Sequence, residues 1–154
     1  MKRIIYLIIF SIFILLNFTS CIFSAGSYSD AERYNLNIPY KDLVIIIKQL
    51  KADSILISPP DTFALEDGND TSDIYDYWYH LYFYYPKEKE IIHSWIRLDS
   101  RNITTLAFVG INKSLRLGDW KRINRNLSRK ENEQEIDKFK KRILNKIIIK
   151  IAQQ

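Results

Sequence analysis

The chain of 154 residues has one cysteine, two histidines and four glycines, and each scarcity excludes a kind of site. A single cysteine cannot form an intramolecular disulfide, so a domain outside the cytoplasm has to be stabilised by packing alone. Glycine-rich phosphate loops and serines in a nucleophile-elbow context are also absent. Because no acid–base or nucleophile constellation can be assembled, we expect neither an enzyme nor a bound cofactor.

Hydrophobic residues make up 47% of the chain and aromatic residues 14%, which is enough for a packed core. The length allows one domain once any processed segment at the ends is subtracted. We therefore expect a single folded domain and not a disordered chain.

The first residues have the order of a secretory signal. Lys2 and Arg3 precede an apolar run over 4–16, and a stretch rich in small and polar residues, 17–20, then leads to Cys21. The apolar run has 13 residues, whereas a helix that spans a bilayer needs about 20. This pattern favours an exported protein.

Residues 1–21 resemble the type II signal of bacterial lipoproteins, in which small residues precede a cysteine that becomes the mature N-terminus. The resemblance implies cleavage after Ser20 and a thioether link from Cys21 to diacylglycerol. It also implies an extracytoplasmic domain, lipid-anchored to the bacterial membrane in the cell envelope. Two alternatives keep the same topology: an uncleaved anchor over 4–23, and an ordinary cleaved signal that leaves a free cysteine.

The formal net charge of +5 falls to +3 when residues 1–20, with their two basic side chains, are removed. Residues 61–76 carry six acids and no base, and residues 113–130 carry seven bases and one acid. Such runs are usually solvated faces, although a basic patch can also rest on anionic headgroups. The exported location and the absence of any binding motif exclude nucleic acid as a partner.

Three segments follow along the chain: a signal peptide over 1–20, a tether over 21–37 and one domain over 38–154. The tether is rich in small and polar residues, with a short helical turn expected around 30–34. The domain should begin with a helix after Pro39, since apolar residues recur at helical spacing, although the run 44–47 also fits a strand.

The clearest element is a helix that starts at Ser128, which forms a capping box with Glu131. Glutamates in its first turns and lysines in its last turns match the helix dipole. Its apolar residues repeat every three or four positions and form one stripe. The stripe consists of Ile136, Phe139, Ile143, Ile147 and Ile151.

Short polar turns separate extended segments at 54–58, 62–66, 75–85, 91–98 and 103–111. Closely spaced strands of this kind form antiparallel hairpins. Together with the helices they predict an α+β fold with two layers. We expect a four-stranded antiparallel sheet with an N-terminal and a C-terminal helix packed on one face.

Six of the ten tyrosines fall within residues 75–85. Pairing Tyr85 with Ile91 across a five-residue turn sets Phe83 opposite His93 and puts the two histidines on opposite faces, which disfavours a His–His metal site. An even-length turn or a bulge would exchange the faces. The acidic turn at 67–73 lacks the glycine and glutamate that a calcium loop needs, so we expect no metal there either.

On this register one face of the sheet collects aromatic and basic side chains of the kinds enriched in interface hot spots. We predict a partner-binding surface for a protein or a glycan. It is formed by Tyr77, Tyr79, Trp95 and Arg97, with His93 at its centre. The alternative is that these rings form a second core beneath residues 22–37.

Two function classes remain. The first is an envelope-anchored binding lipoprotein, of which inhibitory or immunity-type lipoproteins are one form. The second is a non-catalytic structural accessory subunit of an envelope assembly. An exposed aromatic and arginine face favours binding, and a face covered by residues 22–37 favours the structural class.

Overall fold

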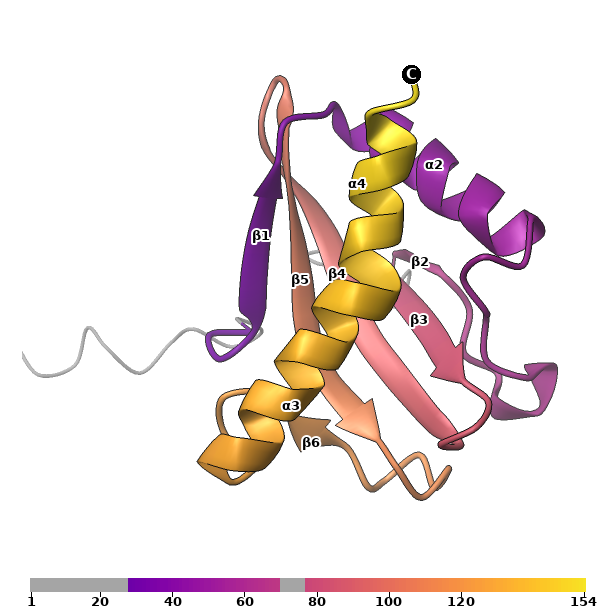
Figure 1. Ribbon diagram of the computed structural model, residues 1–154, viewed down its shortest axis with the longest axis vertical. Coiled ribbons are helices and arrows are strands. Elements are labelled where there is room, and N and C mark those ends of the chain that lie inside the picture. Colours follow the sequence, from indigo (N-terminus) through magenta and orange to yellow (C-terminus); the bar gives the residue numbers. More distant parts are fainter. Residues whose placement is uncertain (1–27, 70–76) are drawn as a thin grey trace, which may run out of the picture.

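The computed structural model describes residues 28–69 and 77–154, and it shows an α+β protein built on one antiparallel sheet (Figure 1). The predicted signal segment, Cys21 and residues 70–76 of the acidic turn lie outside the described residues, as do the predictions that fall on them. No helix in the described ranges is both long enough and apolar enough to cross a membrane.

The elements follow one another in an order that mixes long and very short strands with the helices. They are β1 Glu32–Leu36, α2 Tyr40–Ala52, the 3-10 turn η2 Asp61–Phe63, β2 Gly68–Asn69, β3 Tyr79–Tyr85, β4 Glu90–Ser100, β5 Ile103–Asn112, β6 Lys121–Arg122, α3 Arg129–Phe139, the π-turn η3 Lys140–Leu144 and α4 Asn145–Ile151. The sheet order is β1-β5-β4-β3-β2, and β6 also pairs with β5. The α+β class is confirmed, but the sheet has six strands and not four.

β1 was the least expected strand, because its residues belong to the predicted tether. It pairs with β5 from Glu32, opposite Phe108, to Leu36, opposite Thr104. Tyr34 points to the helical side and stacks on Phe139, with 5.8 Å between ring centroids. The helical turn expected around 30–34 is therefore wrong, since a partner distant in the sequence determines the conformation of this segment.

The expected strands at 54–58 and 62–66 are not formed either. Residues 61–63 make the turn η2, and 55–57 run beside β3 with one hydrogen bond, from the Tyr84 N–H to the Ile57 carbonyl, at 2.8 Å. The strands that take their place in the sheet, β2 and β6, have two residues each, too few for a periodic signal.

α2 forms as a helix, and the strand alternative for its apolar run is wrong. Leu43, Ile46, Ile47 and Leu50 are buried. The helix ends in a Schellman motif: the Ile55 N–H donates to the Leu50 carbonyl at 2.9 Å, and the Ser54 N–H to the Lys51 carbonyl at 3.0 Å. Ser54 takes the left-handed conformation (φ 57°) that this motif requires.

The C-terminal helix begins with the predicted capping box, in which the Glu131 N–H donates to Ser128 Oγ and the Ser128 N–H to the Glu131 carboxylate. Phe139, Ile143 and Ile147 are all buried at intervals of four residues. In a regular α-helix such intervals drift by about 40° per step. The π-turn η3, closed by the Asn145 N–H on the Lys140 carbonyl, widens the helix and keeps the stripe aligned.

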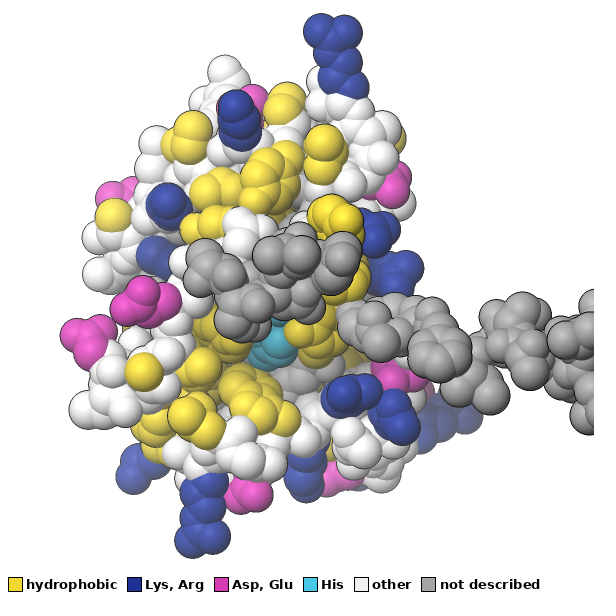
Figure 2. Space-filling view, turned by 180° about the vertical axis from the view of Figure 1, so that it is seen from behind, with side chains coloured by type: hydrophobic (Ala, Val, Ile, Leu, Met, Phe, Trp, Pro, Cys, Tyr) yellow, Lys and Arg dark blue, Asp and Glu magenta, His cyan; other side chains and the backbone are white. Residues whose placement is uncertain are grey.

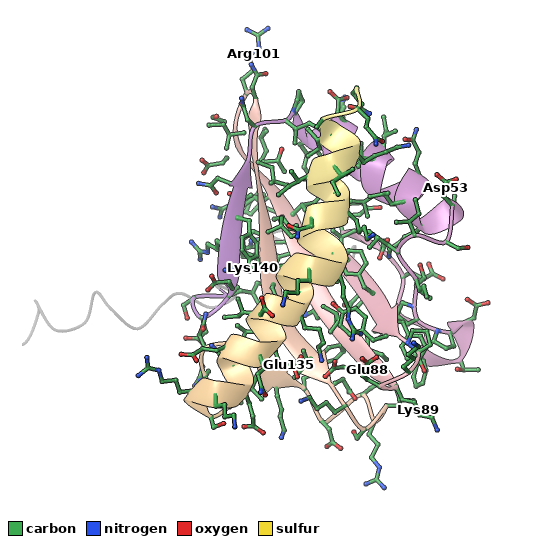
Figure 3. All side chains as sticks on the ribbon, viewed as in Figure 1. Asp53, Glu88, Lys89, Arg101, Glu135 and Lys140 are labelled. Carbon is green, nitrogen blue, oxygen red and sulfur yellow. The ribbon has the colours of Figure 1, made fainter. Side chains whose placement is uncertain are left out.

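Side chains of α2, of the C-terminal helix and of the sheet meet in one main core. At its centre Phe108 of β5 stacks on Phe139 of α3, with 4.5 Å between ring centroids and 4° between planes. β3 contributes Leu81, Phe83 and Tyr85. Charged residues lie at the rim, as Arg101 does where it projects from the β4–β5 turn (Figure 3).

The pairing of β3 with β4 differs from the expected register by one residue. Tyr85 lies opposite Glu90, Phe83 opposite Ile92 and Tyr82 opposite His93. The turn is Pro86–Lys89, four residues long, with Lys89 in a left-handed conformation (φ 53°). Because an odd shift reverses the faces, the odd-numbered residues of β3 point to the main core and the even-numbered ones to the opposite face.

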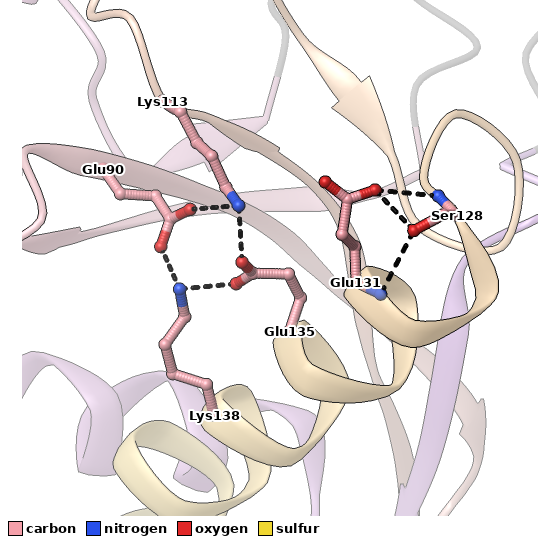
Figure 4. Close-up of polar contacts among 6 residues, drawn as sticks. All are labelled: Glu90, Lys113, Ser128, Glu131, Glu135 and Lys138. Carbon is pink, nitrogen blue, oxygen red and sulfur yellow. Dashed lines mark hydrogen bonds and ion pairs between the residues drawn. The ribbon is translucent and has the colours of Figure 1, made fainter.

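Glu90, expected in the turn, is 1% exposed and belongs to a partly buried ionic quartet (Figure 4). Lys138 of α3 pairs with both Glu90 and Glu135, and Lys113 contacts the Glu135 carboxylate at 2.8 Å and Glu90 at 3.9 Å. Burial raises the pKa of Glu90, the hydrogen bond from Lys138 lowers it, and the net shift is upward. The quartet connects α3 to the adjoining ends of β4 and β5.

Replacing Lys138 by Met should cost about 3–5 kcal/mol of unfolding free energy at pH 7, because it leaves the buried Glu90 with only the exposed Lys113 ammonium, at 3.9 Å. Urea unfolding would measure this loss. Lys141→Met is the matched control, since Lys141 pairs with Asp137 at 2.7 Å but both side chains are more than half exposed, and this change should cost less than about 1 kcal/mol. Equal losses in the two variants would contradict the role assigned to the quartet.

Candidate functional site

The sheet face opposite the main core is built from two adjoining rows of paired residues. The first row runs Arg33, Ala107, Trp95, His80 across β1, β5, β4 and β3. The second row runs Tyr82, His93, Gly110, Arg122 across β3, β4, β5 and β6. Both histidines and two large aromatic residues therefore meet on one face.

Gly110 allows β6 to approach this face. A Cβ at position 110 would lie 2.7 Å from the Lys121 carbonyl oxygen, which is closer than real side chains tolerate. The close approach brings the preceding residue, Trp120, to within 5.7 Å of the His93 ring and 6.4 Å of the Tyr82 ring, between centroids. A side chain from the basic connector thus joins the face.

We call the resulting group the aromatic–histidine cluster. It consists of Tyr28, Trp78, His80, Tyr82, His93, Trp95 and Trp120. Tyr28 packs edge-on against Trp78 and His93, at 5.5 and 5.7 Å, and Tyr82 stacks on His93 at 5.0 Å. Figure 2 shows this side of the molecule, with a histidine side chain in a hollow bordered by hydrophobic side chains.

The two histidines are directly linked, with 2.9 Å between His80 Nδ1 and His93 Nε2. In this hydrogen bond one of the two nitrogens carries a hydrogen and donates it, and the other carries none and accepts it. Burial, together with the electrostatic effect of the neighbouring His80, lowers the pKa of His93 to about 3. His93 is therefore neutral at pH 5–8 and acts as a polar hydrogen-bonding group and not as a cation.

Trp95 lies at the bottom of the cluster and is 1% exposed. The guanidinium groups of Arg33 and Arg97 lie over its ring, at 5.9 and 6.0 Å from the centroid. Tyr28, Ala31 and Trp78 pack against the small core that Trp95 forms with Ala107 and Val109. Trp95 supports the face from below and is not accessible to a partner.

A groove of about 600 Å³ opens beside the cluster. Its walls are the rings of Tyr28, His80, Tyr82 and His93 and the loop 64–69. Asp67 of that loop accepts from the Tyr82 N–H at 2.9 Å and pairs with Lys51 at 2.6 Å. The Lys51 ammonium also donates to the Tyr82 carbonyl, so this ion pair fixes the loop against β3.

The five predicted binding residues do not share one face. His93, Trp95 and Arg97 lie on the cluster side, as expected, although Trp95 is buried. Tyr79 lies on the main-core side, where its ring packs near Tyr40 at 6.4 Å. Tyr77 precedes β3 and is 69% exposed. The arrangement of these residues on a single face is wrong, because the four-residue turn shifts the pairing of β3 with β4 by one residue.

The same shift explains why three residues of the cluster were missed. The expected register places the even-numbered residues His80, Tyr82 and Trp78 on the side opposite His93, and the expectation that the histidines face apart is also wrong. Tyr28 belonged to the predicted tether and Trp120 to a connector without periodicity. The signal in the sequence that could have identified them is the turn PKEK. Its even length allows Glu90 to begin the next strand, opposite Tyr85.

Among residues 28–69 and 77–154, no group of three or more histidine, cysteine, aspartate or glutamate side chains is arranged to hold a metal ion. Part of the acidic turn lies outside these ranges. Within them, Asp67 is engaged by Lys51 and by the backbone of β3.

Comparison with known proteins gives no relative from which a function can be transferred. No protein-family model matches the chain, and neither the curated proteins nor the solved structures include a significant match. The geometry of the site is therefore the main basis for a functional proposal.

The depressed pKa of His93 predicts a pH dependence of stability. In the unfolded chain His93 takes up a proton below about pH 6.5, whereas in the folded protein it stays neutral down to about pH 3. Stability should therefore fall as the pH drops through this window, by up to about 1.4 kcal/mol per pH unit from this group. Urea unfolding at pH 7 and pH 4.5 should show a smaller decrease for His93→Gln, and an unchanged one for the exposed control Tyr77→Phe.

Proposed function

We propose that this protein is an envelope-anchored lipoprotein whose α+β domain binds a partner through the aromatic–histidine cluster and does not catalyse a reaction. The observation that carries the proposal is the groove of about 600 Å³ beside the cluster. In this proposal the two helices cover one face of the sheet and leave the other to the partner. Both helices pack in one core with side chains from the same face of the sheet, which supports this division between a covered face and a binding face.

A glycan is the partner that the groove favours over a protein. Its walls combine flat rings, Tyr28 and Tyr82, with imidazole, carboxylate and amide groups from β3, β4 and the loop 64–69. Rings of this kind stack on the C–H faces of sugars, while the polar groups hydrogen-bond to hydroxyls. A neutral His93 fits such a role, since imidazole then both donates and accepts.

The structural accessory function has one observation in its favour. Trp95 is covered by Tyr28 and Ala31, which precede β1, so part of this face is already buried by the chain itself. If residues 28–31 only seal the sheet, the rings stabilise the domain and bind nothing. The two functions differ in whether Tyr82 and Trp120, both partly exposed, contact a partner.

Capture from detergent-solubilised envelopes tests the binding proposal. The acylated protein as bait should retain material that periodate destroys and protease does not. Trp120→Ala should weaken the capture by at least about 1 kcal/mol, or about fivefold, as truncation of an interface aromatic does. The matched control is Leu117→Ala, which removes an exposed side chain of the same connector outside the cluster and should bind normally.

Protease-sensitive capture that depends on Trp120 would identify a protein partner instead. Unchanged capture by folded Trp120→Ala and by folded Tyr82→Ala, which alters a wall of the groove, would exclude the cluster as the binding surface and leave the accessory function. Near-UV circular dichroism of each variant establishes that the fold is retained.

The lipid anchor is tested separately. Cys21→Ala should leave the precursor unprocessed or release the domain from membranes, because Cys21 is the proposed acceptor of diacylglycerol. Metabolic labelling with a radioactive fatty acid and membrane fractionation measure both effects, with Ser24→Ala as the control. A Cys21→Ala variant that labels and fractionates as the parent does would contradict the anchor.

A further inference from the structure

A second groove, separate from the aromatic–histidine cluster, lies between residues 55–57, the end of β3 and the C-terminal helix. Its volume is about 500 Å³. The walls include Ile55, Ile57, Phe83, Tyr85 and the π-turn residue Arg142. We call it the π-turn groove; it shares no residue with the cluster.

The floor of this groove is apolar and partly uncovered. Phe83 is buried, but Ile55 and Ile57 are 48% and 43% exposed. The segment that carries them is fixed at both ends, by the Schellman motif after α2 and by the Tyr84 N–H bond to the Ile57 carbonyl. The aliphatic surface is therefore preformed on rigid backbone, as expected of a ligand site.

The rim of the groove carries an excess of positive charge. Four basic residues line it, namely Lys87, Lys141, Arg142 and Lys146, against one acid, Glu88. Arg142 contacts Glu88 at 2.7 Å, and this contact occupies only part of the guanidinium. Lys141 and Arg142 lie within the π-turn, and such turns often occur at functional sites.

Tyr85 lines this groove with its ring and carries a buried hydroxyl. The residue is 6% exposed, and its hydroxyl is buried with no hydrogen-bond partner among the described residues. Burial raises the pKa of Tyr85, so the hydroxyl keeps its proton. The Arg142 guanidinium lies 4.8 Å from the centroid of the Tyr85 ring, so the ring helps to hold this cation at the rim of the groove.

We propose that the π-turn groove binds a single-chain anionic amphiphile of the fatty-acid type. The alkyl chain lies along Ile55, Ile57 and Phe83. The carboxylate is held by Arg142 and Lys146. The charge of the rim selects an anionic head over a cationic one, and the volume suits one chain of a small ligand.

The proposal is tested with the full chain in phosphatidylcholine nanodiscs, titrated with laurate carrying ¹³C at its carboxyl carbon. After subtraction of empty nanodiscs, a saturable carboxyl signal at about one laurate per chain is expected. The double variant Arg142→Gln/Lys146→Gln should weaken it at least tenfold. Ile57→Asp, which changes an exposed position and should fold normally, should abolish it.

Matched controls lie on the outer face of α2. Ile45 is 50% exposed and Lys48 is exposed, and neither lines the groove, so Ile45→Asp and Lys48→Gln should leave laurate binding unchanged. Trp120→Ala should also leave it unchanged, which separates this site from the proposed partner surface.

Three results would overturn the proposal. They are the absence of a saturable signal above empty nanodiscs, equal binding of dodecyltrimethylammonium, and equal losses in the groove and control variants. Binding of an acidic peptide without binding of laurate would likewise exclude a fatty-acid site.

Discussion

The burial of Glu90 is the constraint on which the two faces of this sheet depend. Its carboxylate lies 1% exposed between two lysines, one from α3 and one from the end of β5. A buried carboxylate requires such partners, because water no longer solvates it. With Glu90 held inside the sheet, the β3–β4 turn has four residues, and every side chain of β3 has an assigned face.

That assignment produces two different environments from one tyrosine-rich strand. Leu81, Phe83 and Tyr85 complete the main core, while His80 and Tyr82 join His93 on the other face. The bulge at His93–Ser94 and the small residue Gly110 then admit β6 and Trp120 beside them. An ion pair at one end of the sheet thus helps to determine which side chains form the proposed binding face at its centre.

The two candidate sites differ in their chemistry in a way that suits different ligands. The groove beside the cluster has flat rings with neutral and acidic polar groups, whereas the π-turn groove has aliphatic walls with a cationic rim. Stacking and hydrogen bonding dominate the first, and burial of an alkyl chain with charge pairing dominates the second. A domain held near a membrane, as proposed, would meet both kinds of molecule.

Local patterns in the sequence determined the helices and the fold class. These patterns are the capping box at Ser128, the apolar stripe from Ile136 to Ile151 and the apolar spacing within α2. Each involves residues close in the sequence, so each can be recognised without knowing the tertiary contacts. The antiparallel hairpins were predicted from equally local signals, namely short polar turns between extended segments. The seven residues of the stripe and the capping box sufficed to predict how the C-terminal helix starts and which side it buries.

Only the tertiary structure decided the strand count, the register and the site. β1 forms because β5 offers it an edge, and β2 and β6 are too short to carry a period of their own. The register depends on whether Glu90 lies in the turn or in the strand, and its lysine partners come from residues 113 and 138. Because a shift of one residue reverses a strand's faces, this distant ion pairing, which no local pattern encodes, decided which side chains surround His93.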